Sequence, residues 1–232
     1  MFQHDTILFS FRGPMGVRVD VGQSLAFLIG ALVWVNTGGD PVFAFLAPIL
    51  LVLAIFLHEL GHAWGNLVQG VPVQRVMLYG GGGFCQSARS QSAHEAELIV
   101  AMGPIVNLGL WAICSLTYFW VSYYWMNSAA YPGEFAWDTL YYIWLFGYLN
   151  LILFAFNMIP VQPLDGGKLF HLVMLRLMSP DLAQRITGMV GLVLSVAWIP
   201  AMIGLFYFHG WFLFFIPSIA AHYRMMRGAP AY

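Results

Sequence analysis

The chain has 232 residues, of which 60% are hydrophobic and only 8% are charged. Because an average soluble domain is about 25% charged, this composition excludes an ordinary water-soluble protein. Nine basic and ten acidic residues give a net charge of −1, which excludes the basic surface typical of a nucleic-acid-binding protein.

Long uncharged gaps separate the few charged residues. Asp, Glu, Lys and Arg are absent from residues 21–39, 41–58, 98–133, 139–164 and 186–223. A helix that crosses a bilayer needs roughly 20 mostly apolar residues, so each gap is long enough or nearly so. The last gap is interrupted at His209-Gly210 and is expected to hold two spans. The pattern therefore predicts six transmembrane helices.

The first half of the chain combines strand and helix patterns. The alternation at residues 17–21 indicates short strands at the membrane surface, before a first span at about 24–36. A second span is expected at about 42–68. Residues 71–86 then have the pattern of a strand, a glycine-rich turn and a second strand.

The second half is predicted to be helical. A third span is expected at about 96–124 and a fourth at about 139–158, ending before Pro160. Residues 168–177 form a short amphipathic helix, and two further spans complete the chain. The sequence thus predicts an all-α polytopic membrane protein with about six transmembrane helices and a small membrane-associated β-hairpin or sheet.

The basic residues set the expected orientation. With six spans, the N-terminus, the second-to-third and fourth-to-fifth connections and the C-terminus share one side of the membrane. These segments contain all nine basic residues: Arg12, Arg18, Arg75, Arg89, Lys168, Arg176, Arg185, Arg224 and Arg227. The positive-inside rule therefore predicts that both termini and the β-hairpin are cytoplasmic.

The second span ends with an H-E-x-x-H motif, His58-Glu59-Leu60-Gly61-His62. On a helix, positions i and i+4 differ by about 40° and one turn, so both histidines can face one metal ion. Glu59 lies about 100° further round and can reach a water molecule on that ion. Ionisable groups at membrane depth are functional candidates. The alternative is a structural hydrogen-bond cluster.

A catalytic zinc ion usually has three protein ligands and a water, so a third ligand is expected on another element. The fourth span runs in the same direction as the second, which brings Asp165 to a similar membrane depth. Pro160 and Pro163 break the helix, and Gly166-Gly167 lets the backbone turn. Asp165 is therefore the predicted third ligand.

The H-E-x-x-H motif, together with residues 157–160 and Pro163-Leu164-Asp165-Gly166, resembles the site-2 protease family of intramembrane zinc metalloproteases. Residues 101–107 form a third similar element, and the resemblance covers residues 12–178. It implies one Zn²⁺ per chain, held by His58, His62 and Asp165, with Glu59 as the catalytic acid/base.

The resemblance also implies a single intramembrane protease domain over residues 1–232, with a catalytic core at about 22–178 and a C-terminal helix pair at about 182–223. Such an enzyme cuts transmembrane segments, as in regulated intramembrane proteolysis. The expected partners are a transmembrane protein substrate and membrane lipids, with no nucleic acid. We expect a minimal form without a PDZ or nucleotide-sensing domain, in a prokaryotic plasma membrane.

Several residues are candidates for substrate contact. Asn107 either donates to the oxyanion or forms an interhelical hydrogen bond, and Asn157 is expected to bond the substrate backbone. An unwound substrate segment needs a strand edge, and the alternative for the 71–86 segment is a plain membrane-associated hairpin. The candidates for the receiving edge are the strand-like segments 73–79 and 84–86 beside the glycine-rich turn, and in particular Val76, Leu78, Gly80 and Gly81.

Two other functions remain open from the sequence. One is a catalytically silent membrane scaffold or chaperone, and the other is a metal or ion transporter. The complete set of His58, Glu59, His62 and Asp165 argues against the first. His94 and His171, at helix ends, are expected to be ordinary interfacial residues, and His222 near the C-terminus is expected to have no special role.

Overall fold

The structure is a computed structural model that describes residues 5–128, 132–209 and 215–229. The chain divides into two compact units. Unit 1 comprises Met1–Gln91 and Met102–Ala155, and unit 2 comprises Ser92–Ala101 and Phe156–Tyr232. The single domain over residues 1–232 remains a prediction.

Unit 1 holds a small sheet and the helices that contact it. Its elements are β1 (Ile7–Arg12), a 3-10 turn (Pro14–Gly16), β2 (Arg18–Gly22), α1 (Gln23–Asn36), α2 (Pro41–Val68), β3 (Val73–Tyr79), β4 (Gly82–Ser87) and most of α3 (Ala93–Asn127) and α4 (Glu134–Asn157). Unit 2 holds the start of α3, the end of α4, α5 (Asp165–Leu177), α6 (Pro180–His209) and α7 (Ile219–Met226).

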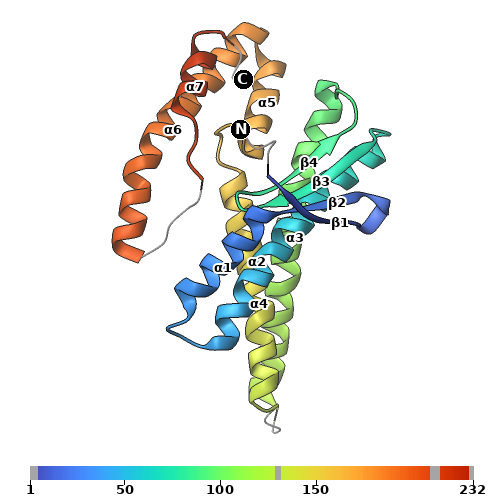
Figure 1. Ribbon diagram of the computed structural model, residues 1–232, viewed down its shortest axis with the longest axis vertical. Helices are drawn as coiled ribbons and strands as arrows, with labels where there is room; N and C mark the ends of the chain where they lie inside the picture. The colour runs from blue at the N-terminus through green and yellow to red at the C-terminus, as the bar shows by residue number, and fades with distance from the viewer. Residues whose placement is uncertain (1–4, 129–131, 210–214, 230–232) are drawn as a thin grey trace. The chain divides into compact units, whose positions relative to one another are not determined.

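The four strands form one sheet in the order β1-β2-β3-β4. β1 and β2 are antiparallel, as are β3 and β4, whereas β2 and β3 are parallel, with Val19 opposite Val76. Parallel pairing requires a crossover that returns the chain to the same end of the sheet. Here α1 and α2 form that crossover as a helical hairpin (Figure 1).

The core of unit 1 lies where this sheet meets the helical hairpin. Its buried apolar residues are Val17, Val19, Val21, Leu25, Ala63, Val76 and Leu78. The alternation that predicted the strands therefore reflects one face of the sheet packed against α1 and α2. Because Ala63 follows His62 directly, this core also fixes the end of α2 that carries the H-E-x-x-H motif.

The start of α2 is fixed by local chemistry. The Asp40 carboxylate accepts a hydrogen bond from the Val42 amide at 2.9 Å, and Pro41 occupies the first helical position. Such a cap satisfies an amide that the helix itself leaves unpaired, and proline is favoured in the first turn. The 28-residue helix that follows is about 42 Å long, enough to cross a hydrocarbon core of about 30 Å.

Four described helices are long and apolar enough to cross a membrane: α2, α3, α4 and the Pro180–Gly204 part of α6. The six predicted spans are therefore not confirmed. Helix α1 has 14 residues and is only about 21 Å long. In the region of the predicted sixth span, the described residues form the eight-residue α7. The turn expected at His209-Gly210 lies partly outside the described residues.

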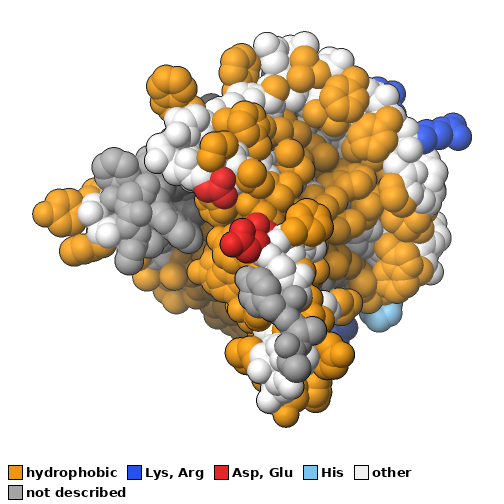
Figure 2. Space-filling view, turned by 90° about the horizontal axis from the view of Figure 1, so that it is seen from below, with side chains coloured by type: hydrophobic (Ala, Val, Ile, Leu, Met, Phe, Trp, Pro, Cys, Tyr) orange, Lys and Arg blue, Asp and Glu red, His pale blue; other side chains and the backbone are white. Residues whose placement is uncertain are grey.

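The helices carry the apolar surface expected of chains that contact lipid. Trp34 is 78% exposed and Phe135 is 86% exposed, and many other large apolar side chains are exposed on α1 to α4 and α6. Figure 2 shows one face that is covered mainly by hydrophobic side chains, with few charged groups. A water-soluble surface would not tolerate this much contiguous apolar area.

A buried carboxylate links three strands of the sheet. Asp20 on β2 has no solvent exposure; it accepts hydrogen bonds from Ser10 on β1 and Arg18, each at 2.7 Å, and from Arg75 on β3 at 3.5 Å. Burial by itself raises the pKa of this carboxyl, but the hydrogen bonds from Ser10 and Arg18 and the charge of Arg18 outweigh it. The pKa of Asp20 is therefore below its ordinary value.

We predict that Asp20→Asn lowers the thermal unfolding midpoint at neutral pH, because a charge-assisted hydrogen bond is worth about 1.5–3 kcal/mol. A lowered folded-state pKa means that the ionised carboxylate stabilises the fold above the unfolded-state pKa. This stabilisation is lost as the pH falls through the folded-state pKa. Thermal unfolding in detergent micelles should show the difference between wild type and variant closing at acidic pH. A difference independent of pH would contradict this role.

Candidate metal centre

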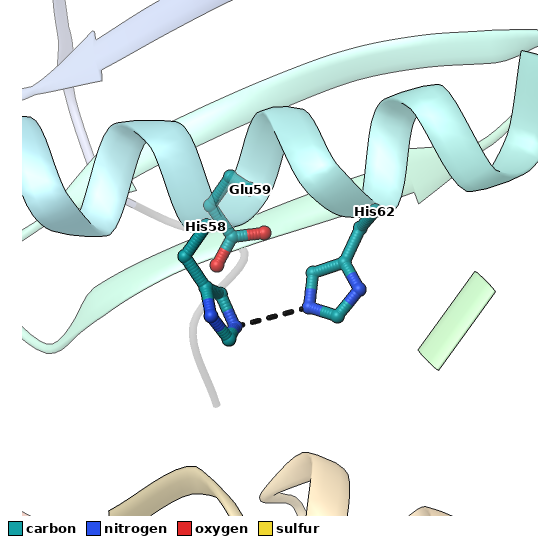
Figure 3. A group of neighbouring side chains, drawn as sticks. All are labelled: His58, Glu59 and His62. Carbon is teal, nitrogen blue, oxygen red and sulfur yellow. Dashed lines mark hydrogen bonds between the residues drawn. The ribbon is translucent and has the colours of Figure 1, made fainter. Parts of the chain in front are cut away.

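Two imidazoles converge on one side of α2. His58 and His62 are 5% and 8% exposed, and their Nε2 atoms lie 3.1 Å apart (Figure 3). Two nitrogens that each bind zinc at about 2.0–2.1 Å in tetrahedral geometry are about 3.3 Å apart. The pair therefore already has the separation that a shared metal ion requires.

Asn107 on α3 fixes the proton on His58. The Asn107 Oδ1 atom lies 2.7 Å from Nδ1 of His58, and both side chains are buried. Because an amide oxygen only accepts, Nδ1 carries the proton and the Nε2 lone pair remains available to a metal. A metal-binding histidine usually has such a partner on its other ring nitrogen. Asn107 therefore contacts the histidine pair from α3, and its role as an oxyanion donor stays a prediction.

The approach of α3 to these imidazoles depends on Gly103. A Cβ atom at this position would lie 2.5 Å from Nε2 of His62 and 2.8 Å from Cε1 of His58. Real side chains do not approach so closely, so only glycine leaves the two rings in place. The sequence indicated this glycine only as part of the 101–107 element, without a role of its own at the site. The adjacent Pro104 and the nearby Asn107 are the signal that marks this turn of α3 as part of the site.

Glu59 lies beside the histidines and faces strand β4. Its ligand atom is within 4.8 Å of those of His58 and His62, and the residue is 5% exposed. A Cβ on Gly83 would lie 2.6 Å from Cγ of Glu59, so β4 approaches this side chain directly. Burial and the charge of Glu59 raise the pKa of Tyr79, which keeps that phenol protonated. Neither Gly83 nor Tyr79 was singled out from the sequence.

The candidate edge residues Val76 and Leu78 do not lie at an edge of the sheet, whereas the candidate segment 84–86 does. Val76 and Leu78 belong to β3, which pairs with β2 on one side and with β4 on the other. Gly80 and Gly81 form the turn between β3 and β4, and the Gly80 amide donates to Ser24 Oγ at 2.7 Å. The error has a physical cause: the partner of β3 lies far away in sequence. The outer strand on this side of the sheet is β4.

Asp165 and Asn157 belong to unit 2. Asp165 begins α5, is 3% exposed, and its Oδ1 accepts from Nζ of Lys168 at 3.1 Å. Asn157 is the last residue of α4. Gly166 is helical, and a Cβ there would lie 2.3 Å from the Met158 backbone. Close approach of two backbone segments, and not an unusual turn, therefore accounts for this glycine. The role of Asp165 as third ligand stays a prediction.

Comparison with known proteins places this site in context. A sequence model described as Peptidase family M50 matches residues 46–198. A zinc metalloprotease of Methanocaldococcus jannaschii is 26% identical over 207 residues, which cover 84% of this chain and 57% of the relative. Stage IV sporulation protein FB of Bacillus subtilis is 26% identical over 186 residues, covering 77% of this chain and 59% of the relative. The chain thus spans less than two thirds of these curated relatives.

A solved structure has the same fold. The site-2 protease from Methanocaldococcus jannaschii superimposes with a TM-score of 0.62 at 20% sequence identity. The match covers 95% of this chain and 92% of the other. It supports the arrangement of apolar helices and a small sheet described above.

We predict that Gly103→Ala lowers zinc affinity at least tenfold, since the added methyl group displaces both imidazoles and effects of this size follow from disturbed ligand orientation. Gly109→Ala on the same helix is the matched control, because a Cβ there meets no atom within 4 Å. Zinc affinity can be measured by competition with a chromophoric chelator in detergent. Equal affinity of the two variants would show that the close approach has no bearing on the metal.

Proposed function

Because the chain belongs to peptidase family M50, we propose that it is an intramembrane endopeptidase that uses one zinc ion per chain. In this proposal the ion is held by His58, His62 and Asp165. Glu59 is the general acid/base. Four apolar helices make the chain an integral membrane protein. The proposed substrate is a transmembrane segment of another protein.

One observation carries the proposal: two buried Nε2 atoms 3.1 Å apart, with the Glu59 carboxylate beside them. The zinc ion, when bound, lowers the pKa of a bound water to about 7 and polarises the scissile carbonyl. Glu59 takes the proton of the attacking water and returns it to the leaving amine. Gly83 closes the space on the β4 side of Glu59 and so helps to orient its carboxylate.

Asn107 is proposed to serve two purposes at once. Its oxygen holds the His58 tautomer, and its Nδ2 is buried with no hydrogen-bond partner among the described residues. A buried unsatisfied donor costs about 1–3 kcal/mol, which a functional group can tolerate when a ligand completes it. We propose that Nδ2 of Asn107 donates a hydrogen bond to the substrate carbonyl oxygen, which becomes negatively charged when water attacks the carbonyl carbon.

The burial of Asp165 and its ion pair with Lys168 support its proposed role as a metal ligand. One carboxylate oxygen accepts a hydrogen bond from Lys168 at 3.1 Å. Ligating carboxylates are commonly held by a hydrogen bond of this kind. Asn157, placed near the same connection, is proposed to bond the backbone of the substrate.

The substrate is proposed to bind in extended form along β4. A peptide bond inside a helix is hydrogen-bonded within that helix, so cleavage requires local unwinding. Strand β4 pairs with β3 on one side of the sheet, and Gly83 brings this strand against Glu59. Strand addition there would lay an unwound segment beside the catalytic carboxylate.

We assign the protein to a prokaryotic plasma membrane, with both termini in the cytoplasm. Arg12, Arg18 and Arg75 all lie on the sheet of unit 1, and the α1–α2 hairpin brings the chain back to this sheet. A concentration of arginine at one end of the helices is typical of the cytoplasmic side.

We expect Glu59→Gln to retain zinc and to lose cleavage by a factor of at least about 10², because the amide cannot accept the proton. Purified wild-type and variant protein are compared on a model transmembrane substrate, with zinc content determined for each. Glu134→Gln, at an exposed position in the first turn of α4, is the matched control. Cleavage by Glu59→Gln at the wild-type rate would overturn the mechanism. A metal or ion transporter, the alternative function, would tolerate the Glu59→Gln substitution.

Asp165→Ala is predicted to lower zinc occupancy, because a catalytic zinc site with two remaining protein ligands binds weakly. Asp181→Ala is the control, since the Asp181 side chain is 67% exposed and pairs with Arg185. Zinc is quantified by elemental analysis after dialysis against a weak chelator. An unchanged zinc content in Asp165→Ala would remove this residue from the ligand set.

A further inference from the structure

His222 on α7 is one of the most deeply buried side chains in unit 2. The sequence indicated no special role for this residue near the C-terminus, yet the side chain is only 1% exposed. A buried imidazole needs partners for both ring nitrogens, since an unsatisfied polar group in an apolar environment is costly. The partners that it has explain its place in the fold.

The hydrogen bonds of His222 define its tautomer. Nδ1 lies 2.8 Å from the Ser218 carbonyl oxygen and 3.2 Å from Ser195 Oγ. A carbonyl only accepts, so Nδ1 carries the proton. Nε2 then accepts a hydrogen bond from the backbone amide of Gln162 at 3.1 Å. The ring is therefore neutral, and each nitrogen has a partner.

Gln162 belongs to the short connection between α4 and α5. Prolines 160 and 163 have no amide hydrogen to donate, and the Val161 and Leu164 amides donate within the connection itself. The Gln162 amide donates instead to α7, sixty residues further along the chain. Asp165 follows Gln162 by three positions. The hydrogen bond to His222 thus anchors the backbone that leads directly to Asp165.

Helix α6 is shaped to admit the His222 ring. A Cβ on Gly191 would lie 2.1 Å from Cδ2 of His222, so any larger residue would expel the ring. Gly188, one turn earlier, has the backbone of Met226 equally close. Small residues at such spacing allow two helices to pack closely. The His222 ring is therefore held within unit 2 by contacts with three elements, namely α6, α7 and the α4–α5 connection.

We propose that His222 is a positioning residue, which fixes the α4–α5 connection through the Gln162 amide and so sets the orientation of the Asp165 carboxylate toward zinc. The inference rests on the proposed function, because it takes Asp165 as a ligand. It gives the C-terminal helix a part in the metal centre without any contact with the metal.

Two substitutions at His222 test the roles of its two ring nitrogens separately. In His222→Gln the amide oxygen can occupy the place of Nε2 and accept from Gln162, whereas His222→Asn keeps a donor near Nδ1 and loses that acceptor. We expect His222→Asn to weaken zinc binding about tenfold, as loss of a group that orients a ligand does. We expect His222→Gln to remain within about threefold of wild type, because the acceptor is restored.

A second experiment measures the local stability of the α4–α5 connection. Hydrogen–deuterium exchange of the peptide that contains residues 158–165 should become faster in His222→Asn and stay near the wild-type rate in His222→Gln. Met225→Ala is the matched control, since Met225 is a buried residue of the same helix that is 5% exposed. This variant should lower thermal stability while leaving both zinc affinity and the exchange of this peptide unchanged.

The outcomes separate the inference from the proposed function. Wild-type zinc affinity in His222→Asn, while Asp165→Ala is impaired, overturns the positioning role and leaves the proposed ligand set intact. Equal weakening in His222→Asn, His222→Gln and Met225→Ala also overturns it, since the role is then only structural. Unchanged zinc affinity in Asp165→Ala removes Asp165 from the proposed ligand set and with it the role of His222 toward zinc.

Discussion

Two imidazoles and a carboxylate buried near the end of one apolar helix constrain everything around them. Polar groups in such a setting are costly unless each finds a partner. Asn107 supplies one for His58, and Gly103 allows α3 to come close enough to do so. On the other side Gly83 brings β4 against Glu59. The glycines and the asparagine near the motif are thus consequences of placing this chemistry inside a membrane protein.

The sheet connects this local chemistry to the fold of unit 1. Strands β2 and β3 lie in its centre. The buried Asp20 carboxylate on β2 accepts hydrogen bonds from Ser10 on β1 and from Arg75 on β3, and so links the three strands. Val76 and Ala63 share one apolar core, so the sheet and the end of α2 are held as one body. A rigid sheet gives β4 a fixed position relative to Glu59. Precision at the site therefore comes from the packing of an element that contributes no metal ligand.

Local patterns in the sequence were sufficient to predict the position of the histidine pair and the presence of the β3–β4 hairpin. The i, i+4 spacing fixes His58 and His62 on one helix face, and alternation with glycines predicts β3 and β4. Contacts between distant segments could not be read in this way. The pairing of β2 with β3 made the predicted edge at Val76 and Leu78 wrong. The burial of His222 depends on Gly191 and Gln162, which no local periodicity connects.

The parallel pairing of β2 with β3 has a consequence for biosynthesis. Val19 cannot meet Val76 until the whole α1–α2 hairpin has been made and has returned the chain to its starting side. Pairing between such distant segments is slow compared with local folding. Because β4 follows α2 in the chain, the strand that approaches Glu59 is also synthesised after α2. A nascent chain consequently contains the complete H-E-x-x-H helix before the sheet that flanks it can form, and the surroundings of the histidine pair are completed late in assembly.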